Sequence, residues 1–335
     1  MVPAPDADDN ETVADGSGAR RSTSSTFVRH VSRVLDRFDA LLPFALVPFA
    51  LSILEFENVR RALDPAPSGS SFNIEFAFPT PLLDLWSFAD PPPASGGGSG
   101  GGSAIGPESD PFEQGSATQT PEPTGSGGTD VTIETPFETI IVPLEAVDGA
   151  MLAWLGLALV VYAVISAVIA AGYLGGIDRR LRDEPASIPA CIIRYAPRLV
   201  LYHLVVFGAF VALVPVLVAA PALLVLAIPA VIVLGYLFYA VPFLFIVDDA
   251  RFLEAFRHSY GYGLEGGPYL RFAFWHVAVA AATSLALSIL LNSGGVGFVV
   301  GLLVATPLAL VLTAATISFV QELVEPDGRE TATLR

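Results

Sequence analysis

The feature that most limits the fold is a run of 49 residues without Asp, Glu, Lys or Arg, from Leu199 to Val247. A helix in a soluble core rarely exceeds about 20 residues, and it keeps a polar face. A charge-free stretch of this length is typical of membrane-spanning segments. The whole chain has 335 residues, of which 53% are hydrophobic and only 15% charged, so the composition also favours a membrane protein.

Six apolar segments predict six transmembrane helices in an all-α membrane protein. They are 40–54, 150–177, 199–219, 222–247, 272–291 and 296–320. The last five are long enough to cross a hydrocarbon core of about 30 Å. The first has only 15 residues, so it spans only if its charged ends reach out to the interfaces. The motifs Gly172-x-x-x-Gly176 and Gly297-x-x-x-Gly301 predict close helix contacts within the chain.

The arginines predict the orientation of these spans. With six spans, 15 of the 17 arginines fall on one side of the membrane, and only Arg60 and Arg61 fall on the other. Loops rich in arginine are retained on the cytoplasmic side. We therefore expect a multi-pass protein of the cell membrane with both termini in the cytoplasm.

The charge composition indicates the environment and excludes one class of partner. The chain has 33 acidic residues and no lysine, since all 17 basic residues are arginine. This balance is typical of halophiles, whose acidic surfaces stay soluble when molar salt shortens the Debye length to about 3 Å. An acidic loop alone is the simpler explanation. A pI near 4.5 argues against a nucleic-acid partner, which would favour a basic patch.

No cofactor or metal is predicted. Cys191 is the only cysteine, which excludes an intramolecular disulfide and a multi-cysteine metal site. Asp248 and Asp249 invite comparison with the metal ligands of CDP-alcohol phosphatidyltransferases, but two carboxylates do not fill the coordination of a catalytic magnesium pair. The simpler interpretation is that they solvate a helix end and pair with Arg251.

The chain divides into five predicted regions. They are an acidic disordered tail (1–22), an amphipathic helix with the first span (23–56), an extracellular loop (57–148), a five-span membrane domain (149–320) and a cytoplasmic tail (321–335). Within the loop, the Gly, Ser and Pro content of 91–129 predicts a disordered linker. Alternating apolar residues at 72–78 and 131–134 predict a small extracellular β element. Residues 82–88 are expected to form an interfacial segment that rests on the bilayer. The loop as a whole is expected to be either a small external receptor element or a lid that packs on the helix ends.

A short internal repeat predicts three similar units. The segments 198–203 (RLVLYH) and 271–276 (RFAFWH) carry arginine and histidine at the same spacing. The second copy has about eight extra residues, from Gly261 to Pro268. Residues 27–38 form a third copy by pattern, with one apolar face and one arginine face. Each unit is expected to be an amphipathic cytoplasmic helix followed by a helical hairpin.

One motif resembles a known group of proteins. Val247-Asp248-Asp249 ends a span and is followed by residues 254–259 (EAFRHS), a pattern similar to that of a broad group of six-span prokaryotic membrane proteins. The group includes the membrane domain of glycerophosphodiester phosphodiesterases and related uncharacterised families. The resemblance covers residues 150–320 and implies a six-span membrane protein, and the charge composition indicates a haloarchaeal member of the group. The catalytic domain of such fusions has no counterpart here, so no phosphodiesterase activity is implied.

The candidate site residues are cationic or titratable groups near the predicted cytoplasmic interface. They are Arg198, His203, Arg271, His276, Arg251 and Arg257. One arginine can donate two parallel hydrogen bonds to the oxygens of a phosphate group. A histidine just inside the bilayer can form hydrogen bonds or relay protons. The alternative is simple anchoring at the interface, beside aromatic residues such as Tyr202 and Trp275.

Three classes of function follow from these features. The first is a non-enzymatic membrane domain that binds lipid headgroups or a membrane protein partner through its arginine-rich cytoplasmic helices. The second is a transporter or permease for a small or apolar solute. The third, a membrane enzyme acting on lipid, is disfavoured because no complete set of catalytic groups is visible.

Overall fold

The structure is a computed structural model that describes residues 26–63, 80–92, 130–134, 139–143, 149–220 and 223–333. Its elements are α1 (Thr26–Leu35), α2 (Phe38–Leu41), the 3-10 helix η1 (Leu42–Ala45), α3 (Leu46–Leu54), α4 (Phe56–Ala62), β1 (Asp130–Glu134), β2 (Thr139–Pro143), α5 (Gly149–Leu181), α6 (Ile188–Ala219), α7 (Leu224–Phe238), α8 (Val241–Val247), α9 (Phe252–Glu265), α10 (Pro268–Leu291) and α11 (Gly295–Thr333). The predicted tail 1–22 and the predicted strand 72–78 lie outside the described residues, as does all but the start of the predicted linker 91–129. The predicted strand 131–134 lies in β1, which pairs antiparallel with β2.

Among the described residues, five helical segments are long and apolar enough to cross a membrane. They lie in α5, α6, α7 with α8, α10 and α11. The chain therefore has the architecture of a multi-pass helical membrane protein. A sixth span is counted only if α1 and the segment 38–54 are taken together, and these two parts are bent by 75°. The predicted first span, 40–54, is thus one arm of a bent pair, in which η1 carries Pro43 in its first turn.

The three predicted repeat units do not have the same helices. The predicted amphipathic helix before residue 199 is continuous with its span, because α6 runs unbroken from Ile188. In the other copy, α9 and α10 are separate helices. Gly266 and Gly267 lie between them with φ of +65° and +51°, a backbone conformation that glycine adopts without steric cost. At the end of the chain α11 continues to Thr333, so most of the predicted tail 321–335 is helical.

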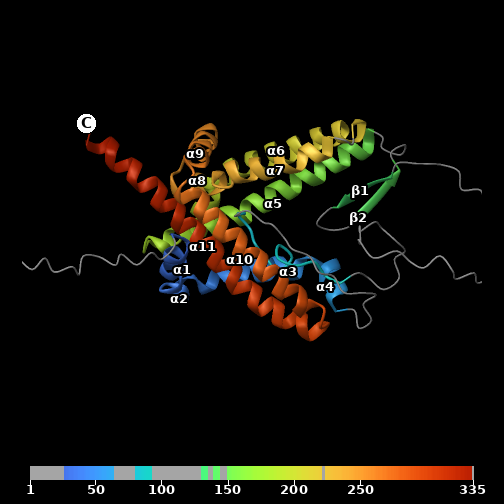
Figure 1. Cartoon of the computed structure of the whole chain (residues 1–335), viewed down its shortest axis with the longest axis horizontal. Coiled ribbons are helices and arrows are strands. Elements are labelled where there is room, and N and C mark those ends of the chain that lie inside the picture. The colour runs from blue at the N-terminus through green and yellow to red at the C-terminus, as the bar shows by residue number, and fades with distance from the viewer. Residues whose placement is uncertain are drawn as a thin grey trace, which may run out of the picture.

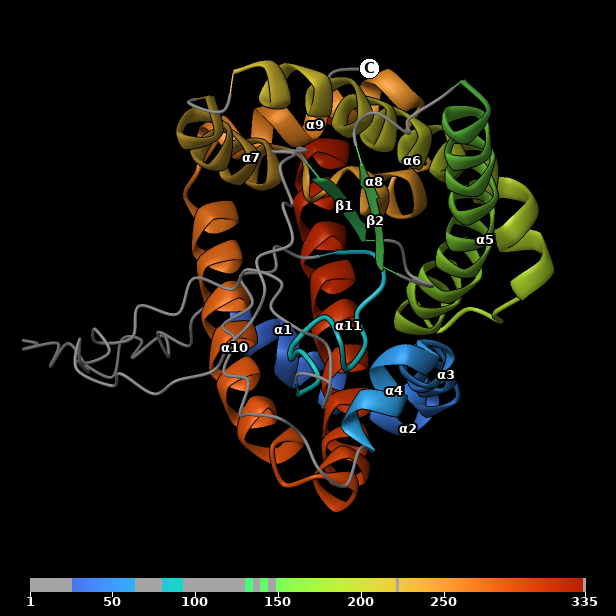
Figure 2. The same ribbon diagram turned by 90° about the vertical axis from the view of Figure 1, so that its right-hand side faces the viewer.

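Figure 1 shows two groups of long helices that diverge from one end of the molecule. One group holds α5, α6 and α7, and the other holds α10 and α11. Around the end where the groups meet lie α1, α9 and the turn between α5 and α6. We call this the arginine end, because it carries the described arginines other than Arg60 and Arg61. Seen from the side in Figure 2, α11 stands between α10 and α5.

The segment 80–92 is packed into the helices and does not lie exposed as an interfacial segment. Leu85 and Phe88 are completely buried. The Leu85 N–H donates to Ser52 Oγ at 2.9 Å, and the Trp86 indole N–H donates to the Ser52 carbonyl at 2.7 Å, which ties the segment to α3. The Trp86 ring stacks on Phe298 of α11, with 6.0 Å between ring centroids. The expected placement of residues 82–88 on the bilayer surface is therefore wrong, whereas packing of this part of the loop on the helices fits these contacts.

Glycines allow α5 to approach its neighbours closely. A Cβ atom added to Gly175 would lie 2.8 Å from Cys191 Cβ on α6. A Cβ on Gly172 would lie 3.1 Å from Ile188, and one on Gly176 would overlap the ring of Phe44. The first predicted glycine motif therefore lies at contacts within the chain.

Candidate functional site

A carboxylate between α8 and α9 holds two arginines of α6. The guanidinium of Arg194 donates to both carboxylate oxygens of Asp249, at 2.7 and 3.2 Å. The guanidinium of Arg198 donates to the same carboxylate at 2.7 Å and to the Asp249 carbonyl at 2.9 Å. Because the two arginines are four residues apart, they project from one face of α6 and reach a single partner. Arg198, a predicted headgroup ligand, therefore serves to join α6 to the α8–α9 connection.

The two adjacent aspartates have opposite electrostatic environments. Hydrogen bonds from Arg194 and then from Arg198 lower the pKa of Asp249 below its ordinary value. Burial raises the pKa of the neighbouring Asp248, whose carboxylate lies 3.4 Å from His258 Nδ1. The expected pairing of these aspartates with Arg251 is wrong for Asp249, which pairs with Arg194 and Arg198.

We expect Asp249→Asn to destabilise the protein at pH 7 and Asp248→Asn to leave it unchanged or more stable. Both changes remove one negative charge, and asparagine tolerates the positive φ of Asp249 as aspartate does. Because Asp249 is 40% exposed, the loss should be only about 1 kcal/mol. Thermal unfolding in detergent measures the difference. The pKa of Asp249 is lower in the folded state than in the unfolded state, so its contribution should persist at neutral pH. It should be lost as the pH falls through the folded-state pKa, below the ordinary value for aspartate. Equal melting temperatures for the two variants at pH 7 would contradict the assignment.

Several other arginines at the arginine end also have partners within the chain. Arg29 of α1 pairs with Glu322 of α11. Arg37 donates to the Leu181 carbonyl and pairs with Asp183, which joins the first helices to the end of α5. These ion pairs also take up several of the carboxylates at this end. They connect elements that are far apart in the sequence.

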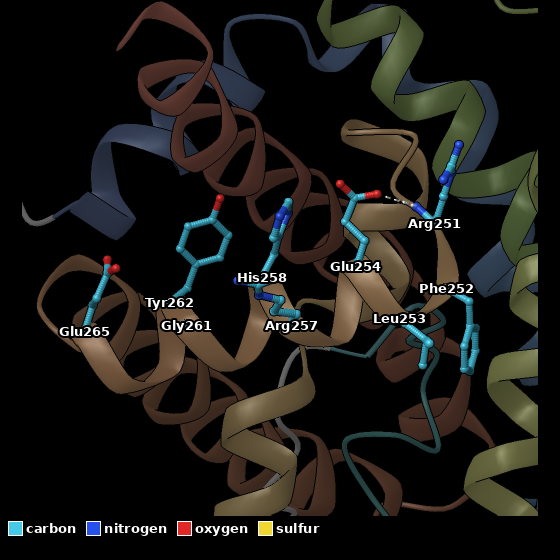
Figure 3. A pocket seen from close by; sticks show the side chains of 9 residues that line it. All are labelled: Arg251, Phe252, Leu253, Glu254, Arg257, His258, Gly261, Tyr262 and Glu265. Atoms are coloured by element: carbon cyan, nitrogen blue, oxygen red, sulfur yellow. Dashed lines mark hydrogen bonds between the residues drawn. The ribbon is translucent and has the colours of Figure 1, made fainter. Parts of the chain in front are cut away.

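Three of the predicted site arginines differ from these, because they are exposed and have no ion pair among the described residues. They are Arg251, Arg257 and Arg271. Arg251 precedes α9, and its backbone N–H donates to the Glu254 carboxylate at 3.2 Å. Arg251 and Arg257 line an open groove of about 970 Å³ along α9 (Figure 3). Glu254 and Glu265 line the same groove, so its charge is mixed.

The neighbouring face of α9 combines one arginine with exposed apolar side chains. Leu253, Arg257, Tyr260 and Leu264 are separated by four, three and four residues, which places them on one side of the helix. Leu253 is 78% exposed and Leu264 65% exposed. We call these four residues the α9 stripe. Its combination of leucine, tyrosine and arginine is typical of a helix that lies in a membrane interface.

The first turns of α10 carry a similar set of side chains. Arg271 is exposed there beside Leu270, Phe274 and Trp275, all of which are exposed as well. Large apolar side chains next to an arginine match the aromatic belt at the boundary between lipid and water. The α9 stripe and these first turns of α10 follow each other directly in the chain.

The predicted histidines do not join these arginines. His203 Nδ1 lies 2.7 Å from the Leu199 carbonyl of its own helix. His276 is completely buried, and neither ring nitrogen has a hydrogen-bond partner among the described residues. Its ring lies beside Phe272, with 6.2 Å between centroids. The segments 198–203 and 271–276 thus have the same spacing of arginine and histidine, but these side chains make different contacts in the two segments.

Two features of this end were not found from the sequence. The role of Asp249 depends on its contacts with Arg194 and Arg198, which precede it by about 50 residues in the sequence, and no local pattern reveals such contacts. The α9 stripe, in contrast, follows from helical spacing and was accessible to sequence reasoning. Comparisons with protein-family models, with curated proteins and with solved structures found no match to this chain.

Proposed function

We propose that this protein is a non-enzymatic membrane domain that binds anionic lipid headgroups at its arginine end. The α9 stripe and the first turns of α10 form the binding surface, and Arg257 and Arg271 bind phosphate oxygens. The observation that carries the proposal is the difference between the arginines. Arg194 and Arg198 are held by Asp249, whereas Arg257 and Arg271 are exposed, without an ion pair among the described residues, and flanked by exposed apolar side chains.

The apolar side chains would hold the surface at the depth where the phosphates lie. A leucine side chain that leaves water for the acyl boundary contributes about 1.5–3 kcal/mol. Leu253 and Leu264 are exposed enough on α9 to do so, at 78% and 65%. An arginine between them on the same face then meets phosphates without leaving the interface. In molar salt such direct contact matters more than long-range attraction, which is screened.

The double substitution Arg257→Lys with Arg271→Lys tests this function. Total charge is unchanged, but lysine cannot donate two parallel hydrogen bonds to one phosphate. We expect about a tenfold loss of co-purified anionic lipid, which corresponds to one charge-assisted hydrogen bond. Native mass spectrometry of the detergent-extracted protein measures the bound lipid directly.

The matched control is Arg60→Lys with Arg61→Lys. It makes the same chemical change on α4, where both arginines bond to neighbours in their own helix. This control should retain the lipid of the unaltered protein. Equal retention in both double variants would eliminate headgroup binding and leave simple anchoring as the role of these arginines.

The proposal includes an orientation and a relationship. The arginine end, with both chain termini, would face the cytoplasm of a halophilic cell, and the loop that holds β1 and β2 would be an extracellular β element. The helices of the three units differ. Each unit would nevertheless derive from the same repeat, an amphipathic helix followed by a helical hairpin, as in the six-span prokaryotic group that the sequence resembles. The distribution of arginines supports this orientation.

Thiol labelling in intact cells tests the orientation. In a Cys191→Ala background, cysteine at Ser99 should react with an impermeant reagent, because Ser99 is in the loop assigned outside. Ser187 is exposed in the turn between α5 and α6, which is assigned to the cytoplasm. A cysteine at this position should therefore react only after the cells are opened. Labelling of Ser187→Cys in intact cells would reverse the assignment.

A further inference from the structure

A second cavity lies between two membrane-spanning helices near the arginine end. It has a volume of about 360 Å³. One wall is α6 from Tyr202 to Leu213, and the other is α7 from Val231 to Phe238. Apart from Thr80 and the hydroxyl groups of Tyr202 and Tyr239, the lining consists of aliphatic or aromatic side chains, with glycine and proline. An apolar cavity of this kind offers water too few hydrogen-bond partners to hold it.

The cavity opens toward the surroundings of the helices. Several of its lining residues are strongly exposed, among them Phe210 at 52% and Leu234 at 51%. They belong to segments that are long and apolar enough to cross a membrane, so this open side would face lipid chains. The cavity is therefore a lateral groove, which we call the α6–α7 groove. Its open side would be next to the hydrocarbon chains of the membrane.

The length and position of the groove match one leaflet. From Tyr202 to Leu213 the wall rises about 16 Å, at 1.5 Å per residue. This is about half of a hydrocarbon core of about 30 Å. One end of the groove is lined by Phe256 of α9, and Tyr202 there lies one helical turn from Arg198. The groove thus begins at the level of the arginines and runs toward the middle of the membrane.

We propose that the α6–α7 groove binds a hydrocarbon chain of a phospholipid from the leaflet at the arginine end. The lining excludes water, the open side faces lipid, and the length fits one chain. At the start of the groove Arg194 and Arg198 share the carboxylate of Asp249, so these three side chains together carry one net positive charge, which favours a phospholipid with an anionic headgroup. This inference extends the proposed headgroup function, but it depends on different residues.

Photolabelling in nanodiscs tests the chain site. The probe is a phosphatidylglycerol with a diazirine in one acyl chain, and mass spectrometry maps the labelled peptides. In the unaltered protein we expect labelling to be concentrated on residues 202–213 and 231–238. Ala209→Phe places a ring in the groove from α6, and Val231→Phe does so from α7. Each substitution should reduce labelling of these peptides about tenfold, because the added ring occupies the space that the acyl chain would fill.

The matched control is Gly208→Phe. A Cβ atom at Gly208 has nothing within 4 Å, and this position lies on a different face of α6 from Ala209. Its labelling should equal that of the unaltered protein. Size-exclusion profiles identify a variant that fails to fold, in which case the variant on the other wall decides. Undiminished labelling in a folded groove variant, or labelling spread evenly around α6 and α7, would overturn the chain site.

The headgroup function is distinguished from the chain site by the Arg257→Lys and Arg271→Lys double variant. Retained groove labelling in that variant, together with lost native lipid, would show that the two sites act separately. Lost groove labelling in Ala209→Phe, with native lipid retained, would support the chain site and show that the headgroup surface does not need it.

Discussion

Gly297→Ala should greatly reduce the yield of folded protein. Gly297 is in the first turn of α11, directly after the turn from α10. A Cβ atom there would fall on the Leu290 carbonyl oxygen and lie 2.7 Å from the Leu290 carbonyl carbon. Backbone atoms of α10 cannot move aside as a flexible side chain would, so the hairpin would have to open. We expect a loss of about 3 kcal/mol or more, measured as thermal unfolding and as the monodisperse fraction in detergent.

Gly301→Ala is the matched control on the same helix. The nearest atoms to an added Cβ there are side-chain carbons of Leu287 and Leu85, both at 3.8 Å, which is ordinary van der Waals contact. Alanine also favours the helix over glycine by up to about 1 kcal/mol. Gly301→Ala should therefore be neutral or stabilising. If the two substitutions have similar effects, the close approach of the two helices at Leu290 is not as described.

This pair shows what a glycine motif does and does not determine. The four-residue spacing of Gly297 and Gly301 indicates one small-residue face, and nothing in the sequence distinguishes the two positions. Their difference arises because the α10–α11 turn is tight, with Gly294 at a φ of +73°. Turn geometry places the Leu290 carbonyl against Gly297. Contacts of this kind depend on backbone paths that spacing alone does not predict.

The helices themselves were largely predictable, because long apolar segments have one stable form in a membrane. The bend after α1 was less accessible. The segment 40–54 is short for a span and contains Pro43 and Pro48, but the 75° angle depends on packing against other helices. The continuity of α6 through Pro197 was also missed, since proline usually marks a helix boundary.

The sequence indicates which type of residue forms the candidate site, but not which of the arginines belong to it. Arginines near the predicted interface point to the arginine end. Arg198 and Arg271 have matching sequence surroundings, yet Arg198 is held by Asp249 and Arg271 is exposed. Which arginine is available depends on where a distant carboxylate lies, and a single sequence does not reveal that contact.

The last prediction concerns a carboxyl group at the opposite end of the molecule. Glu55 follows α3, and the Asn58 side chain donates to its carboxylate at 2.6 Å. Burial first, and then the nearby charge of Asp84, raise the pKa of Glu55 to about 7, against the lowering effect of the hydrogen bond from Asn58. The folded state therefore binds more protons than the unfolded state between about pH 4.5 and 7. The free energy of unfolding should fall as the pH rises through this range.

Glu55→Gln should remove this pH dependence, because glutamine resembles the protonated carboxyl group and still accepts from Asn58. At pH 8 the variant should be more stable by about 2 kcal/mol, since one pKa unit corresponds to about 1.4 kcal/mol and solvent screens part of the shift. At pH 4.5 the two proteins should melt together. Glu57→Gln is the control, because Glu57 is 47% exposed and pairs with Arg60, so its effect should be small at both pH values. A Glu55→Gln protein that melts with the unaltered protein at pH 8 would show that Glu55 is fully ionised and solvated in the folded state.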